Sequence, residues 1–120
     1  MKTGHVRDNF PRLLLSLPGL EDVLAVEFII DTGFDGELAL PAALATQLEI
    51  LSASNRPVRL ADGTLRHRPY YEILLDWEEE PRRTEVLVIE GNPLLGVELL
   101  SGSLLQIEVI DGGEVSIEPL

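Results

Sequence analysis

The residues with the clearest chemical potential are Asp31, Thr32 and Gly33, which directly follow the apolar run Val26–Ile30. An apolar run of this kind predicts a buried strand, and Asp and Gly after it predict a tight turn that holds the Asp31 carboxylate on a hydrophobically anchored loop. A carboxylate held there can act as an acid or a base on water. The tripeptide alone is weak evidence, because average residue usage produces Asp-(Ser/Thr)-Gly by chance in roughly one chain of this length in twenty.

The elements around this turn have the rhythm of antiparallel β structure, since short apolar stretches alternate with turn residues. Residues Arg12–Leu17 and Leu24–Ile30 are predicted to form an opening hairpin across Pro18 and Gly19. Glu37–Leu40 is predicted to be a short strand after the turn. The alanines and leucines of 42–48 favour a short helix that begins after Pro41.

The rest of the chain continues this pattern. Asp62-Gly63 is a strong hairpin signal between flanking strands at 58–60 and 65–67. Further strands are expected at 70–77, 84–89, 104–110 and 114–117, and a second short helix within 94–102. Residues 1–9 are interpreted as a possible frayed arm.

Length and composition favour one domain over residues 1–120, because 120 residues with 45% hydrophobic content support one modest core. The chain has no cysteine, so a disulfide framework and a thiolate metal site are excluded. His5 and His67 are the only histidines and have no cysteine partners, which argues against a zinc site or a histidine-based triad. We expect neither a metal nor a cofactor.

The charge balance of 9 basic against 21 acidic residues gives a net charge of -12, which repels phosphate backbones and anionic membrane surfaces. Binding of nucleic acid or membrane is therefore not expected. The N-terminus lacks the pattern of a signal peptide, and the longest apolar runs are too short to span a bilayer. Together with the lack of cysteine, this predicts a cytoplasmic protein.

Three features follow one another in a fixed order: the Asp31-Thr32-Gly33 turn, the hairpin around Asp62-Gly63, and the apolar-apolar-Gly segment Leu94-Leu95-Gly96. Over roughly residues 12–110 the chain resembles the retropepsin-like (retroviral-type, clan AA) aspartic proteases, including their bacterial and cyanobacterial relatives. In that family the last motif reads apolar-apolar-Gly-x-(Asp/Asn)-apolar-Leu, and here it reads Leu-Leu-Gly-Val-Glu-Leu-Leu over 94–100. The resemblance implies an all-β, closed acid-protease barrel with one or two short helices.

The resemblance also implies roles for single residues. Asp31 would be the catalytic aspartate, the hydroxyl of Thr32 would lock two catalytic turns together, and Gly33 would let the substrate approach. The segment Leu94, Leu95 and Gly96 would pack beside the catalytic turn. The implied substrate-binding residues are Asp35 and the flap residues Ala61, Asp62, Gly63 and Thr64.

Two positions depart from the family pattern. Many members have arginine and then asparagine or aspartate after the glycine, whereas this chain has Val97 and Glu98. The ion pair that such an arginine makes with the acid at the position of Asp35 therefore cannot form. The flap tip has Asp62 where viral flaps are mostly glycine and apolar residues. Asp35 is as compatible with a structural turn cap as with substrate contact.

Peptide hydrolysis by this route needs two carboxylates that share one proton, one acting as a base on water and the other polarising the scissile carbonyl. The chain has one Asp-Thr-Gly and is too short for two lobes, so the resemblance implies a homodimer with Asp31 of each subunit on the two-fold axis. The expected function is endopeptidase activity on a peptide or protein substrate. The C-terminal hairpin 104–120 is expected to extend the dimer interface. The alternative is a non-catalytic dimeric peptide-binding module on the same fold.

Overall fold

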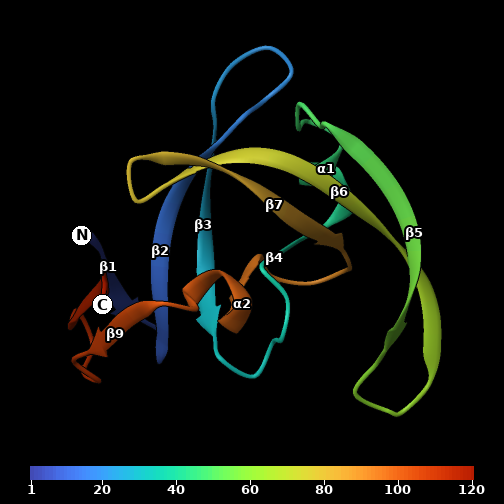
Figure 1. Ribbon diagram of the computed structural model, residues 1–120. Coiled ribbons are helices and arrows are strands. Elements are labelled where there is room, and N and C mark those ends of the chain that lie inside the picture. The colour runs from blue at the N-terminus through green and yellow to red at the C-terminus, as the bar shows by residue number, and fades with distance from the viewer.

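The computed structural model describes residues 1–120, which form one ten-stranded sheet and two short helices (Figure 1). The order of strands across the sheet is β5-β6-β7-β4-β8-β3-β2-β1-β10-β9. In chain order the elements are β1 (Lys2–Arg7), β2 (Phe10–Leu17), β3 (Leu24–Asp31), β4 (Leu38–Leu40), α1 (Ala42–Ala45), β5 (Ser52–Arg59), β6 (Leu65–Trp77), β7 (Glu80–Val88), β8 (Leu94–Gly96), α2 (Val97–Leu100), β9 (Ser103–Ile107) and β10 (Glu114–Pro119).

The predicted all-β class with one or two short helices is confirmed, whereas the predicted closed barrel is wrong. The sheet has two free edges, β5 and β9, and no hydrogen-bonded ladder joins them. Proline at position 57 of β5 suits such an edge, because it has no N–H to donate to a further strand. None of the helices is long and apolar enough to cross a membrane.

The way the strands contribute to the core is seen in β2, where buried and exposed side chains alternate. Leu13, Leu15 and Leu17 are buried while Leu14 and Ser16 between them are exposed, as the two-residue period of a strand requires. β2 pairs antiparallel with β3, which confirms the predicted opening hairpin. The fully buried side chains of the common core include Phe28, Leu38, Ile73, Val86 and Leu95.

The N-terminal segment is not a frayed arm. Residues 2–7 form β1, which pairs with β2 on one side and β10 on the other. Asp8 and Asn9 make the two-residue turn into β2 with φ of 53° and 65°, and Asp and Asn tolerate this left-handed region better than most residues. Figure 1 shows both termini on the same side of the molecule, where β1, β9 and β10 come together.

The hairpin β5–β6 is longer than predicted and projects from the body of the molecule (Figure 1). β6 runs without interruption from Leu65 through Pro69 to Trp77. No residue of β5 is buried, and burial in β6 begins only at Ile73. The hairpin is therefore held at its base, and its outer part is held mainly by strand pairing.

Candidate functional site

Asp31 is the last residue of β3, and its main chain lies beside Gly96 of β8. The two strands pair in parallel, with Ile30 opposite Leu95 and Asp31 opposite Gly96. Burial of Ile30 and Leu95 in the core fixes this register, because a slip of one residue would turn apolar side chains outward. The two sequence motifs that lie furthest apart along the chain thus meet at one point.

The turn after β3 holds the Asp31 carboxylate in a defined orientation. The Gly33 N–H donates a hydrogen bond to Asp31 Oδ1 at 2.9 Å, and the Phe34 N–H donates to the Asp31 carbonyl at 3.1 Å. A Cβ atom on residue 33 would lie 3.2 Å from Asp31 Oδ1, which is a tight contact. The carboxylate is half-buried, so it stays accessible while its backbone is fixed.

The loop that follows is tied to the end of β8. The Gly96 N–H donates to the Glu37 carbonyl at 2.8 Å, and the Val97 N–H donates to the Phe34 carbonyl at 2.9 Å. A Cβ atom on residue 96 would lie 2.2 Å from the carbonyl oxygen of Gly36, a distance that no side chain can accept. Glycine at position 96 is therefore a condition for the loop to close over β8.

Glu37 anchors the same loop to β7 and was not identified from the sequence. Its Oε1 accepts the Glu85 N–H at 3.1 Å, and its Oε2 accepts a hydrogen bond from Arg82 Nη2 at 2.7 Å. Burial raises the pKa of Glu37, Arg82 opposes this effect, and the nearby charge of Glu98 adds to it. A single glutamate before an apolar strand gives no sequence signal for such a role.

A hollow of about 290 Å³ lies next to this loop. The hollow is lined by residues 34–38, by Arg56 and Tyr70 of the β5–β6 hairpin, by Glu85 and Leu87 of β7, and by Glu98 of α2. Asp35 is exposed at this hollow. The hollow lies between the loop after Asp31 and the hairpin.

The predicted flap tip is ordered by its own hydrogen bonds. Asp62 Oδ1 accepts the Thr64 N–H at 2.9 Å and the Thr64 hydroxyl at 2.6 Å, and these bonds lower the pKa of Asp62. Arg59 Nη1 donates to the Gly63 carbonyl at 2.9 Å. Gly63 has a φ of 86°, which glycine adopts without strain.

The tip nevertheless lies apart from Asp31. Figure 1 shows it at the outer end of the hairpin, separated from the loop after β3, and none of Ala61–Thr64 lines the hollow. The structure places Asp31 beside Gly96 of the Leu94–Gly96 segment. Asp35 lines the hollow, which Asp31 and Leu94–Gly96 do not line, and the predicted flap residues lie outside both groups. The hairpin residues that do meet the loop, Arg56 and Tyr70, were not predicted.

Thr32 lies outside the hollow beside Asp35, at a neighbouring hollow that shares Glu98 with it. It is exposed, and its hydroxyl makes no hydrogen bond within the chain. It lines a second hollow of about 410 Å³ with Val97, Leu105 and the segment 100–103. A polar group next to Asp31 is thus left free on a partly apolar surface.

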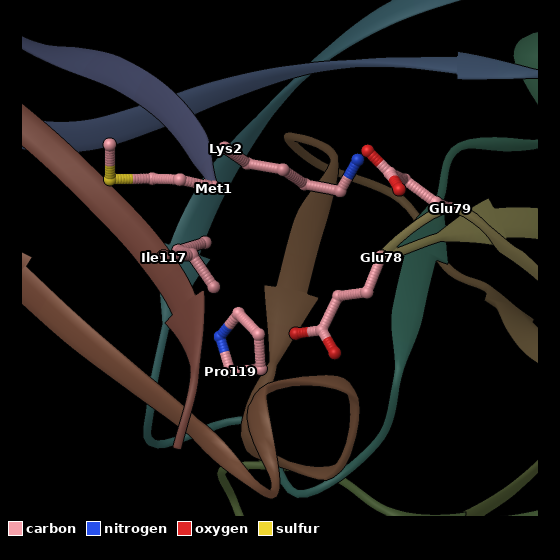
Figure 2. A pocket seen from close by; sticks show the side chains of 6 residues that line it. All are labelled: Met1, Lys2, Glu78, Glu79, Ile117 and Pro119. Atoms are coloured by element: carbon pink, nitrogen blue, oxygen red, sulfur yellow. The ribbon is translucent and has the colours of Figure 1, made fainter.

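A third hollow, of about 450 Å³, lies where the chain ends meet the β6–β7 turn (Figure 2). Figure 2 shows Lys2 extended toward Glu79, with Glu78 and Pro119 lining the space nearby. The Lys2 ammonium also lies 5.2 Å from the ring centre of Trp77. None of the predicted site residues is here, and the arrangement is that of a surface cation packed on an aromatic ring.

No group of three or more His, Asp and Glu side chains is placed to hold a metal ion. Comparison of the chain with protein-family models, curated proteins and solved structures found no match. The functional conclusion therefore rests on the geometry of the site.

Proposed function

We propose that this protein is a homodimeric aspartic endopeptidase of the retropepsin-like type, with Asp31 of each subunit forming the catalytic pair. One observation carries the proposal: the Asp31 turn and the Leu94-Leu95-Gly96 segment lie side by side, with Asp31 opposite Gly96. The Gly33 N–H that binds Asp31 Oδ1 adds to it, because it fixes the carboxylate with one oxygen held and the other free.

The chemistry follows from two carboxylates that share one proton. The ionised Asp31 takes a proton from water as the water oxygen bonds to the scissile carbonyl carbon. The protonated Asp31 of the other subunit donates a hydrogen bond to the carbonyl oxygen. When the tetrahedral intermediate collapses, the C–N bond breaks and the amine nitrogen receives the proton.

The second subunit is proposed to dock on the face that carries Thr32 and α2. Thr32 has a free hydroxyl there, Val97 is 43% exposed, and Leu105 of the edge strand β9 lines the same hollow. An unpaired edge next to exposed apolar side chains suits pairing with a second copy. The C-terminal hairpin β9–β10 would contribute its free edge β9 to this interface, since β10 is already paired with β1 of its own chain.

The absence of cysteine suits a reducing compartment, and we propose the cytoplasm as the site of action. In this setting the substrate would be an extended peptide segment that passes over the Asp31 pair and reaches the hollow beside residues 34–38.

The proposal is tested by incubating the purified protein with an unstructured protein substrate from acidic to neutral pH. We expect cleavage that pepstatin, a mimic of the tetrahedral transition state, blocks. Asp31→Asn should lower the rate by about three orders of magnitude or more. Asp76→Asn, which removes one carboxylate from an exposed position of β6, is the matched control and should retain activity. Substrate binding by a demonstrated dimer without cleavage at any pH would overturn the proposal in favour of a peptide-binding module.

A further inference from the structure

The unpaired arginines of this chain are gathered on one element. The chain has eight arginines, and three of them have no carboxylate within 4.0 Å: Arg59, Arg66 and Arg68. All three lie on the β5–β6 hairpin. The arginines elsewhere in the chain are each paired with at least one acidic side chain.

The hairpin also differs in charge from the rest of the molecule. Residues 52–72 contain four arginines against Asp62 and Glu72, a balance of +2. The remaining residues contain five basic against nineteen acidic side chains, a balance of -14. Because the hairpin projects from the body (Figure 1), salt at physiological concentration weakens the repulsive effect of the acidic body on anions near its outer part.

The pairing register places most of these arginines on one face. Arg56 lies opposite Arg68, and Val58 lies opposite Arg66, so Arg56, Arg66 and Arg68 point to the same side of the hairpin. Tyr70, two residues after Arg68, shares that side. We name Arg56, Arg66, Arg68 and Tyr70 the arginine face. Through Arg56 and Tyr70 it continues into the hollow beside the loop after Asp31.

Arg56 and Arg68 face each other at the end of the arginine face that is nearest the hollow, but only Arg56 has a carboxylate partner. Arg56 pairs with Glu85 and stacks on the Tyr70 ring, with 3.6 Å between the guanidinium carbon and the ring centre. Arg68, directly opposite, has no carboxylate partner. Like charges directly across two strands destabilise a hairpin, and an anion bound beside Arg68 would relieve this repulsion.

We propose that the arginine face binds an extended peptide segment that carries carboxylates at alternate positions. Arg66 and Arg68 are two residues apart on one strand, so their Cα atoms are separated by about 6.8 Å, which matches alternate side chains of an extended peptide. A long polyanion such as nucleic acid would also extend over the acidic body and be repelled there. The inference that the arginine face binds an acidic peptide does not depend on protease activity. Only the further step, that this face selects substrates for cleavage, rests on the proposed function.

The test uses the full chain with Asp31→Asn, so that cleavage plays no part in the readout. Fluorescence anisotropy would measure binding of a labelled eight-residue peptide of alternating Glu and Ser, with Gln replacing Glu in the control peptide. We expect the Glu peptide to bind more tightly, and added salt to weaken it. Arg66→Gln with Arg68→Gln should weaken binding about tenfold, or about 1.4 kcal/mol.

Arg59→Gln is the matched control, because Arg59 lies on the same hairpin but on the opposite face, across from Leu65. It should weaken binding less than about threefold. Equal effects of the two sets of substitutions, or equal binding of the Glu and Gln peptides, would overturn the inference. Tighter binding of a single-stranded oligonucleotide of equal charge would also overturn it. An effect of the double substitution on sedimentation, without any effect on peptide binding, would overturn it too, because it would indicate that the arginine face contacts another copy of this chain. Failure of cleavage by the unsubstituted protein leaves the inference standing.

Discussion

The loop around Asp31 and the β5–β6 hairpin are held in place by different forces. The loop rests on Leu38 and Leu95, which are fully buried, and backbone hydrogen bonds join it to the end of β8. The outer hairpin has no buried side chain and depends on strand pairing and on its own tip contacts. Elements with few buried contacts open at low free energy. The difference implies that the proposed chemistry is rigidly positioned while the proposed recognition element can adjust to its ligand.

The contrast between the two regions predicts that the same Leu→Ala truncation lowers the free energy of unfolding far more beneath Asp31 than in the hairpin. Leu95→Ala should lower the free energy of unfolding by about 4 kcal/mol, because it removes fully buried methyl groups and leaves a cavity beneath Asp31. Leu65→Ala, at a hairpin position that is 56% exposed, should cost under about 0.5 kcal/mol. Urea denaturation of both variants measures the difference. Costs within about 1 kcal/mol of each other would contradict the contrast.

A smaller effect is expected from Gly96→Ala. The new Cβ would collide with the Gly36 carbonyl oxygen, so the loop must move, at a cost of about 2–3 kcal/mol. Gly102→Ala is the control: residue 102 has a φ of 85° and open space around it, so only backbone strain of about 1 kcal/mol is expected. Denaturant titration of the two variants tests the close approach, which would be refuted if Gly96→Ala were the milder change.

The contribution of Glu37 to anchoring the loop can be tested by measuring the stability of the fold as a function of pH. Burial raises its pKa above 4.5, so the folded chain binds this proton more tightly than the unfolded chain. The stability that this group contributes is fully present below pH 4.5 and is lost as the pH rises through the raised folded-state value. Relative to Glu37→Gln, the unsubstituted chain should therefore be less stable at pH 7 than at pH 4. Thermal unfolding across this range would show it, with Glu49→Gln, at an exposed position, as the charge control.

The smallest effect belongs to the hairpin tip. Hydrogen bonds from the Thr64 hydroxyl and N–H lower the pKa of Asp62 below 3.8, so its contribution to tip order is present above that value and is lost as the pH falls through the folded-state pKa. Asp62→Asn should speed hydrogen exchange of the Thr64 amide and leave the midpoint of global unfolding almost unchanged. Thr64→Val should weaken the same protection by removing the hydroxyl. Unchanged exchange in both variants would show that the tip is ordered by other contacts.

Much of the strand pattern could be predicted from the sequence, because the leucines of β2 and the Asp62-Gly63 turn have strong local signals. The family resemblance implied that Leu94–Gly96 packs beside the Asp31 turn, and β8 lies next to β3 at that point, with Asp31 opposite Gly96. The turn at Asp8-Asn9 was missed, although this pair suits positive φ, because the short strand before it alternates weakly. Which hairpin residues approach the loop depends on the curvature of the sheet, and local sequence does not encode this curvature.

Closure of the sheet was predicted wrongly for a similar reason. Hydrogen bonding between distant edges depends on the relative position of β5 and β9, which no turn or periodicity specifies. Glu37 also escaped notice, because its role depends on Arg82 and Glu85 of a strand far along the chain. Long-range contacts of this kind decide a site without leaving a local pattern.

The central claim is that one active site needs Asp31 from two subunits, and mixing subunits tests it most directly. Unsubstituted and Asp31→Asn chains would be denatured together in equal amounts, refolded, and assayed for cleavage per total chain. If both carboxylates are required, only dimers of two unsubstituted chains are active, and the activity falls to about one quarter. Mixing with Asp76→Asn chains should cause no such loss. An activity of about one half would show that each chain acts alone and would contradict the shared dyad.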